Sequence, residues 1–178
     1  MKPGLKVKRL NIYQSLFLTM AIMGQSCAIY RAFARPLPSD AEMQSLFAQN
    51  RSAFETVVGM SNEDASLIRI SYDFTFVTGK GPSNDTGDTG LSKERWEEYK
   101  SYFRILDLDS GIGHYENGSV WFLSYSHGLA VSGISKGYIY SQAPIDCSGK
   151  SLDKPDILGE KRFMCKQLDL NWYLYLSN

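Results

Sequence analysis

The chain has 178 residues and carries 19 basic and 19 acidic side chains, which gives a formal net charge of zero at pH 7. Four of the basic residues and none of the acidic ones fall within the first thirty positions, which leaves 15 basic against 19 acidic residues in the remainder. This balance argues against nucleic acid as a partner, because nucleic-acid-binding domains present a basic face. Aromatic residues make up 13% of the chain, a content typical of a sheet-rich domain.

A basic tail at residues 1–9 precedes an uncharged segment at residues 10–30, and Arg9 and Arg31 flank this segment. As an α-helix the segment is about 30 Å long, which matches the hydrocarbon core of a bilayer. The positive-inside rule predicts that the tail stays in the cytoplasm. We therefore expect a single-pass protein of a bacterial inner membrane, anchored through residues 10–30, whose remaining chain lies in the periplasm.

Two other interpretations of residues 10–30 stay open. Ala32-Phe33-Ala34 has the small-residue pattern that precedes a signal-peptidase cut, so cleavage after Ala34 predicts a secreted domain. In the third interpretation Cys27 becomes a lipid-bearing N-terminus, although the Gly-Gln-Ser that precedes it is a poor lipoprotein signal. All three interpretations place the following domain outside the cytoplasm.

Residues 31–38 are expected to form a linker, and residues 39–178 have the size of a single domain. Beyond the N-terminal segment the chain has two cysteines, Cys147 and Cys165. Because a lone cysteine pair in an oxidising compartment is usually bridged, we predict a disulfide between them. Closing a loop of this length stabilises a fold by about 3 kcal/mol in the chain-entropy account.

The first expected helix starts at residues 39–42, where the sequence Ser-Asp-Ala-Glu matches a capping box. Its apolar stripe is typical of a helix packed on a core, and Gly59 predicts its end. Apolar and polar residues then alternate over residues 68–76, which predicts a single strand with one buried face. The glycine-rich residues 79–90 predict a loop.

Ser92 is placed to cap a second helix. The expected buried stripe of that helix is Trp96, Tyr99, Phe103 and Leu106. Asn117-Gly118 is typical of a two-residue type I′ turn and predicts a hairpin. Further strands are expected at residues 138–140, 162–167 and 172–176. The sequence therefore predicts an α+β fold, a meandering antiparallel sheet with two helices packed on one face, preceded by the N-terminal transmembrane or signal helix.

One motif points toward catalysis. Residues 133–137 spell Gly-Ile-Ser-Lys-Gly, the pattern of a nucleophile elbow, which needs a strand, a sharp turn and a helix in succession. A strand-like sequence follows instead, which favours a glycine-rich strand entry or bulge. The alternative function is a small serine hydrolase that uses Ser135 with His114 or His127, the chain's two histidines.

Three acidic patterns favour ordinary turns. Residues 85–87 and 88–90 both read Asp-Thr-Gly, but two such triplets in one polar loop do not hold a rigid carboxylate pair. Residues 107–111 resemble the start of a calcium loop and lack its later ligands. Neither histidine has a cysteine or an acid at ligand spacing. The sequence therefore predicts no metal site and no cofactor.

Four short stretches together resemble a family of small bacterial envelope proteins that have one N-terminal membrane segment and no assigned activity. The stretches are Arg35-Pro36-Leu37-Pro38-Ser39-Asp40, Asn50-Arg51 with Phe54-Glu55, Ser135-Lys136-Gly137-Tyr138, and Trp172-Tyr173-Leu174. The resemblance implies an envelope location and one compact domain, and it implies no catalytic residue.

The leading expectation is a non-enzymatic, membrane-anchored periplasmic module that binds a protein partner in the envelope, by neutralising a toxin or by serving an envelope complex. The expected contact surface is Tyr125, His127, Lys136, Tyr138 and Tyr140. Aromatic side chains are enriched in protein interfaces, which motivates this choice. The simpler interpretation of the same residues is packing within the sheet. Besides the serine hydrolase, a second alternative to the binding module is a structural envelope lipoprotein.

Overall fold

The structure is a computed structural model that describes residues 35–178, apart from residues 116, 128–132, 148 and 155–162. The chain divides into two compact units, Met1–Pro36 and Leu37–Asn178. The predicted membrane segment at residues 10–30, the lipid site at Cys27 and the cut after Ala34 all fall on residues that are not described. Within the described part, no helix has the length and apolar character needed to cross a bilayer.

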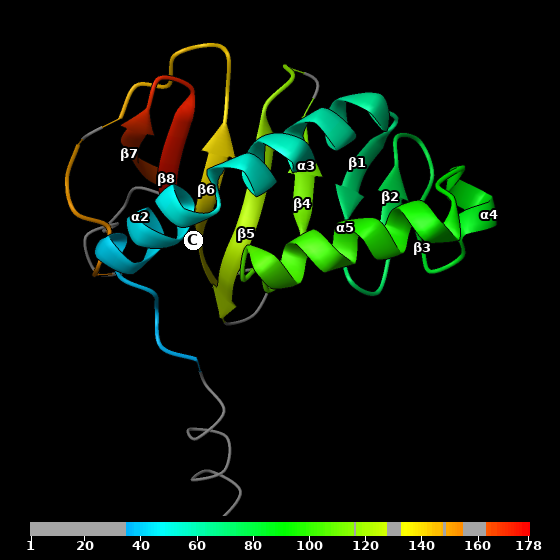
Figure 1. The fold of residues 1–178 in the computed structure, drawn as a ribbon, viewed down its shortest axis with the longest axis horizontal. Coiled ribbons are helices and arrows are strands. Elements are labelled where there is room, and N and C mark those ends of the chain that lie inside the picture. The colour runs from blue at the N-terminus through cyan, green and yellow to red at the C-terminus, as the bar shows by residue number, and fades with distance from the viewer. Residues whose placement is uncertain (1–34, 116, 128–132, 148, 155–162) are drawn as a thin grey trace, which may run out of the picture. The chain divides into compact units, whose positions relative to one another are not determined.

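Eight strands form one antiparallel sheet in the order β3-β2-β1-β4-β5-β6-β8-β7 (Figure 1). Their bounds are Leu67–Ile70 (β1), Thr75–Val77 (β2), Pro82–Ser83 (β3), Ile112–His114 (β4), Val120–His127 (β5), Ile134–Tyr140 (β6), Phe163–Asp169 (β7) and Trp172–Ser177 (β8). The strand order follows the sequence from β4 to β6, but β8 then lies between β6 and β7. The predicted antiparallel α+β fold is confirmed.

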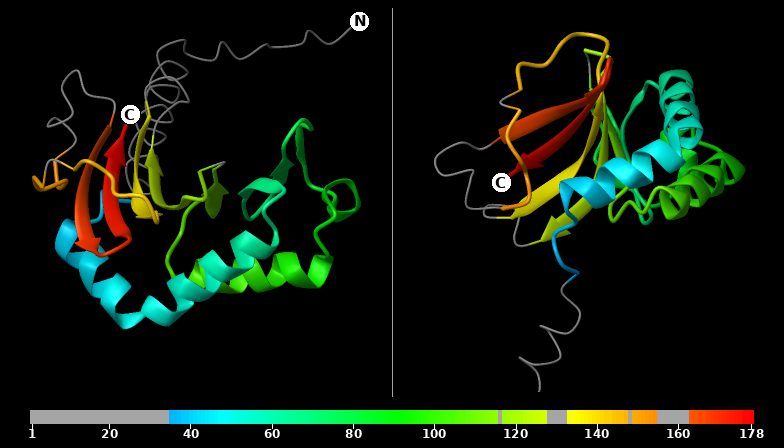
Figure 2. Two further views of the ribbon diagram at one scale, coloured as in Figure 1. Left: turned by 90° about the horizontal axis from the view of Figure 1, so that it is seen from above. Right: turned by 60° about the vertical axis from the view of Figure 1, so that its left-hand side comes forward.

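The helices α2 (Asp40–Gln49), α3 (Arg51–Glu63) and α5 (Lys93–Ile105) cover one face of the sheet, and α4 (Thr86–Thr89) is a single turn (Figure 2). The capping box before α2 and the Ser92 cap of α5 are present as predicted. The single helix expected over residues 39–59 is instead two helices. Asn50 separates them and donates its backbone N–H to Leu46 O at 3.0 Å.

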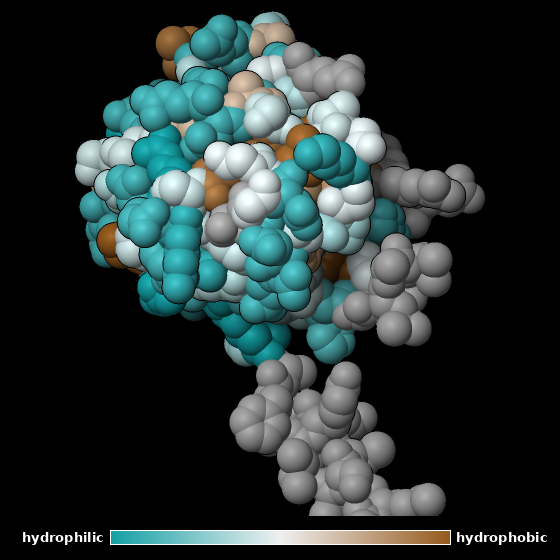
Figure 3. Space-filling model, turned by 90° about the vertical axis from the view of Figure 1, so that its right-hand side faces the viewer, coloured by the Kyte–Doolittle hydropathy of each residue, from teal (hydrophilic) through white to brown (hydrophobic). Residues whose placement is uncertain are grey.

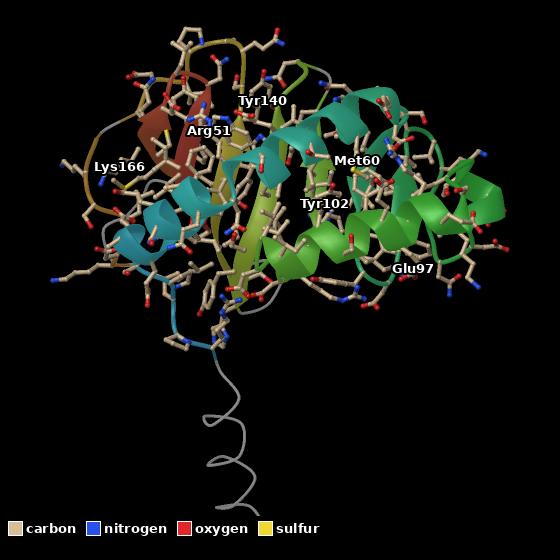
Figure 4. The ribbon with its side chains drawn as sticks, viewed as in Figure 1. Arg51, Met60, Glu97, Tyr102, Tyr140 and Lys166 are labelled. Atoms are coloured by element: carbon tan, nitrogen blue, oxygen red, sulfur yellow. A yellow bond between two sulfur atoms is a disulfide. The ribbon has the colours of Figure 1, made fainter. Side chains whose placement is uncertain are left out.

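The core under the helices is built largely from rings. Phe54 is fully buried, and its ring centroid lies 5.2 Å from that of Phe122, 4.7 Å from Tyr138 and 5.6 Å from Trp172. The helix α3 runs through Gly59 to Glu63 because Met60, on the same stripe, is buried as well. Met60 and Tyr102 lie between α3 and α5, whereas Glu97 lies on the outer side of α5 (Figure 4).

The single strand expected over residues 68–76 is a tight hairpin. Its first arm is β1 and its second is β2, and the Ser71 backbone N–H donates to Phe74 O at 2.9 Å across the turn. The Trp96 indole N–H donates to Ser71 O at 2.8 Å, which anchors this turn to α5. The burial along β1 does not follow the period of two, because the register shifts between Leu67 and Arg69 and both Leu67 and Ile70 lie in the core, so the alternation in the sequence does not reveal the turn.

The hairpin between β4 and β5 is confirmed, but its turn is longer than a two-residue type I′ turn. Gly118 N–H donates to Tyr115 O at 2.8 Å, and Tyr115 N–H donates to Ser119 O at 3.0 Å. Gly118 has φ +76°, as expected of the glycine in a three-residue hairpin loop with a bulge.

Both edges of the sheet are protected from pairing with another chain. The edge strand β3 has two residues and one is Pro82, which has no N–H to donate. The surface at this end of the molecule is largely hydrophilic (Figure 3). At the other edge, the chain after β6 is held to β7 by the predicted disulfide between Cys147 and Cys165, with 4.9 Å between their Cα atoms.

Candidate functional site

Two of the five residues expected on a contact surface lie in the core. The Lys136 side chain is fully buried, and its Nζ lies 2.8 Å from Asp40 Oδ1 and donates to Pro38 O at 2.8 Å. Tyr138 is fully buried under the helices and donates its hydroxyl to Met43 O at 2.9 Å. Both residues therefore pack and pair inside the domain, and neither offers an atom to a partner.

The other three expected contact residues do not form one surface. Tyr125 is 8% exposed and stacks on the exposed His127, with ring centroids 6.4 Å apart, at one end of β5. Tyr140 lies at the opposite end of β6 and packs on Trp172 at 5.2 Å. Tyr140 and Arg51, seen close together in Figure 4, line a separate hollow of about 270 Å³.

The expected catalytic residues are not brought together. Ser135 lies within β6, so the nucleophile-elbow sequence has no strand-turn-helix geometry, and its hydroxyl lies 3.5 Å from that of Ser177. His127 pairs with the neighbouring Ile134, so its side chain leaves the opposite face of the sheet from Ser135. His114 lies on β4, beyond β5. The described residues therefore give Ser135 no imidazole to activate it.

The acidic patterns form local turns, as expected. Asp85 Oδ1 accepts a hydrogen bond from Gly87 N–H at 2.9 Å, and Ser83 Oγ donates to Asp88 Oδ2 at 3.0 Å. Asp109 Oδ2 accepts from Ser126 N–H at 3.2 Å, which fastens the loop after α5 to β5. Within the described part of the chain, no three histidine, cysteine or acidic side chains gather closely enough to hold a metal ion.

The face of the sheet opposite the helices carries a continuous row of cross-strand neighbours. From β2 to β8 the row runs Phe76, Arg69, Gly113, Trp121, Ile139, Tyr173. The alternate residues of these strands, such as Ile70 and Phe122, belong to the core under the helices. Strand alternation therefore directs the row away from the helices, and no described helix covers it.

Aromatic rings cluster around Trp121 on this face. Its ring centroid lies 5.3 Å from that of Tyr115, 4.9 Å from Tyr175 and 5.6 Å from Phe163. Tyr115 is 50% exposed, although it is among the largest apolar side chains of the domain. Beside this cluster, Trp121 and Phe163 line a hollow of about 350 Å³ together with Pro144 and other residues of the loop after β6.

Arg69 stands in the same row with little to neutralise its charge. Its Nη2 donates to Ser110 O at 3.3 Å, and its buried Nε has no hydrogen-bond partner. No described carboxylate lies within ion-pair distance of it. Burial lowers the pKa of the Arg69 guanidinium from its ordinary value, because the charged form loses hydration. We name the surface formed by Phe76, Arg69, Tyr115, Trp121 and Phe163 the aromatic face.

No protein-family model, curated protein or solved structure matches this chain. The aromatic face therefore rests on geometry alone. Sequence reasoning missed it because Arg69 and Trp121 are 52 residues apart and come together only through the strand register, by the pairing of Arg69 with Gly113 and of Gly113 with Trp121. The alternation over residues 68–76 placed Arg69 on the wet side of the expected strand but assigned Phe76 to its buried stripe, so it signalled only one of these two residues.

Proposed function

We propose that this chain is a non-enzymatic binding module of the bacterial envelope, whose domain at residues 39–178 takes a protein partner on the aromatic face. The observation that carries the proposal is the half-exposed Tyr115, whose ring is tilted against that of Trp121 on a sheet face that no described helix covers. Tyrosine, tryptophan and arginine are the residues most enriched at the energetic centres of protein interfaces. The aromatic face combines all three types.

The proposed location follows from the N-terminal residues and from the disulfide. The basic tail at residues 1–9 and the uncharged residues 10–30 support a single-pass anchor with the domain in the periplasm. The bridge between Cys147 and Cys165 supports an oxidising compartment, because cysteine pairs in the cytosol are kept as reduced thiols. The resemblance to small envelope proteins with one membrane segment agrees with this location.

Photocrosslinking in living bacterial cells tests the partner. A benzophenone amino acid replaces Tyr115 in the full chain, and the matched control carries it at Glu97, which is exposed on the outer side of α5 (Figure 4). We expect ultraviolet light to give a discrete adduct from position 115 and none from position 97. The additional substitution Trp121→Ala is expected to weaken the adduct at position 115. Equal adducts at both positions, or none at position 115, contradict the proposal.

Protease protection tests the location independently of the partner. Proteinase K added to intact cells is expected to leave the domain whole, and the same enzyme added to spheroplasts is expected to degrade it. A tag at the N-terminus is expected to survive in the spheroplasts because the basic tail lies inside. Protection of the domain in spheroplasts whose periplasmic marker proteins are digested contradicts a periplasmic location.

A further inference from the structure

Arg69 opens onto a hollow of about 770 Å³ at the β1–β3 end of the aromatic face. Phe74, Phe76 and Pro82 supply apolar walls, and Ser83 and Asn84 supply neutral polar groups. Among the described residues, Arg69 is therefore the one charged side chain that lines the hollow. Such a lining suits a ligand group that is mostly apolar and carries a single negative charge.

The charge surroundings of the hollow limit what it can accept. Ser83, in its wall, donates to the carboxylate of Asp88 at 3.0 Å, and the following residue pair Asn84–Asp85 adds a second acid beside it. These carboxylates repel a ligand with several negative charges, such as a phosphate dianion or an acidic tract. One guanidinium matches one carboxylate in charge and in hydrogen-bond geometry.

The shape of the hollow favours a macromolecular ligand. It is shallow and open to solvent on its outer side, whereas sites for small molecules enclose most of their ligand. On the sheet Arg69 pairs with Gly113, and the ring of the exposed Tyr115 lies 3.5 Å from the position that a Cβ on Gly113 would take. An extended apolar segment that ends at Arg69 therefore finds aromatic contacts as it leaves the hollow.

We propose that the hollow holds the carboxyl terminus of a partner polypeptide, with the terminal carboxylate on Arg69 and the preceding apolar side chains on Phe76 and Tyr115. This inference rests on the proposed function and names the group that the aromatic face recognises. The Arg69 guanidinium has lost part of its hydration and has one weak acceptor, Ser110 O at 3.3 Å. A carboxylate would replace that missing hydration with charge-assisted hydrogen bonds.

Two pools of fluorescein-labelled hexapeptides test the proposal. In both pools the last three positions are drawn from Val, Leu and Phe; one pool ends in a free carboxylate and the other in a carboxamide. Binding to the full chain in detergent micelles is measured by fluorescence anisotropy. We expect the carboxylate pool to bind at least tenfold more tightly than the amide pool, because the amide removes the negative charge and replaces one acceptor oxygen with a donor that the guanidinium cannot bind.

Variants assign that preference to Arg69. Arg69→Gln is expected to abolish the tenfold difference, and Arg69→Lys is expected to keep part of it, since lysine retains the charge without the planar fork. Arg104→Gln, which removes an exposed arginine of α5, is the matched control and is expected to change nothing. Circular dichroism spectra and melting temperatures establish that each variant is folded. The comparison of the two peptide pools on the unchanged chain tests the proposal even if a variant does not fold.

Three results would overturn the inference: equal binding of the two pools, no binding of either pool, or stronger displacement by phosphate than by acetate at equal ionic strength. Each of them leaves the photocrosslinking experiment to judge the proposed function separately. If the adduct at position 115 persists in Arg69→Gln and the two peptide pools bind equally, the proposed carboxyl-terminus ligand is rejected and the proposed protein partner is retained. If no adduct forms at position 115, both the carboxyl-terminus ligand and the protein partner are rejected.

Discussion

Lys136 and Asp40 form an ion pair inside the domain, with 2.8 Å between Lys136 Nζ and Asp40 Oδ1. The pair joins the middle of β6 to the first residue of α2. Asp40 Oδ2 also accepts the Leu152 backbone N–H at 3.0 Å, and Lys136 Nζ donates to Pro38 O. The chain that enters the domain, a central strand and the loop after β6 therefore meet at one buried polar cluster.

Removing one charge of this pair is expected to be costly. Lys136→Met leaves the Asp40 carboxylate, 4% exposed, with the more distant Lys166 Nζ, 3.7 Å from Asp40 Oδ2, and we expect a loss of about 3 kcal/mol in the free energy of unfolding. Urea unfolding of the full chain, followed by tryptophan fluorescence, measures it. The double variant Asp40→Leu/Lys136→Met is expected to recover most of the loss, since no charge then stays buried alone. A double variant as unstable as the sum of the two single variants contradicts this account.

Gly137 is expected to tolerate no side chain. A Cβ at this position would meet Phe122 O and would lie 2.9 Å from the Tyr175 ring. Because that carbonyl belongs to the paired strand β5, relief requires the β5–β6 register to shift, and we expect Gly137→Ala to lose about 2–3 kcal/mol. Gly59→Ala is the control: nothing lies within 4 Å of its Cβ position, and a gain of about 0.5–1 kcal/mol is expected in mid-helix. If the urea midpoints of both variants shift in the same direction from that of the unchanged chain, this explanation is refuted.

The disulfide is expected to contribute measurably to stability. Cys147 and Cys165 are 18 residues apart, and removal of the bridge by Cys147→Ala/Cys165→Ala is expected to cost about 3 kcal/mol. Reductant is expected to lower the urea midpoint of the unchanged chain and to leave that of the double variant where it is. An unchanged midpoint for the natural chain, with both thiols shown to be reduced by labelling, would disprove the contribution.

Acid is expected to weaken the start of α2. The Ser39 backbone N–H, 2.7 Å from Glu42 Oε2, and the Ser39 hydroxyl hold the pKa of Glu42 below its ordinary 4.5. The Asp40 backbone N–H, 2.6 Å from Asp153 Oδ1, does the same for the pKa of Asp153. Because both pKa values are lower in the folded state, this stabilisation is complete above about pH 4.5 and is lost as the pH falls through the folded values.

Urea unfolding between pH 3 and pH 7 measures that dependence. We expect Glu42→Gln/Asp153→Asn to show a flatter decline below pH 4.5 than the unchanged chain, because the two titrating carboxylates are gone. Gln49→Glu, which adds an exposed carboxylate at the other end of α2, serves as a control for general acid sensitivity. Parallel curves for the natural chain and the double variant would rule the two carboxylates out.

Features that depend on neighbours in the sequence were predictable. Ser39 and Glu42 form their capping box, Ser92 caps α5, and Gly118 turns the hairpin, because each interaction spans only a few residues. The disulfide was predictable from the cysteine count together with the expected oxidising compartment. The break at Asn50 was not, because it depends on how α2 and α3 each reach the sheet.

Features that depend on strand register escaped prediction. From the sequence alone Lys136 is expected on the surface. Its burial is explained by its ion pair with Asp40, which lies 96 positions earlier in the chain. Arg69 reads as the wet side of a strand, yet Phe76 and Gly113 flank it in the sheet. The expected contact surface at residues 125–140 failed for the same reason: the alternation along β6 was visible, but the helices that cover its face with Tyr138 come from another part of the chain.

The position of β8 has a consequence for how the polypeptide matures. Trp172–Ser177 pairs with β6 on one side and with β7 on the other, so β7, although earlier in the sequence, has no neighbour until these six residues arrive. A nascent chain that emerges N-terminal end first must keep the edge of β6 open until then. Pairing of β7 is therefore deferred to the end of synthesis, whereas the strands from β1 to β6 can pair with one another as they emerge.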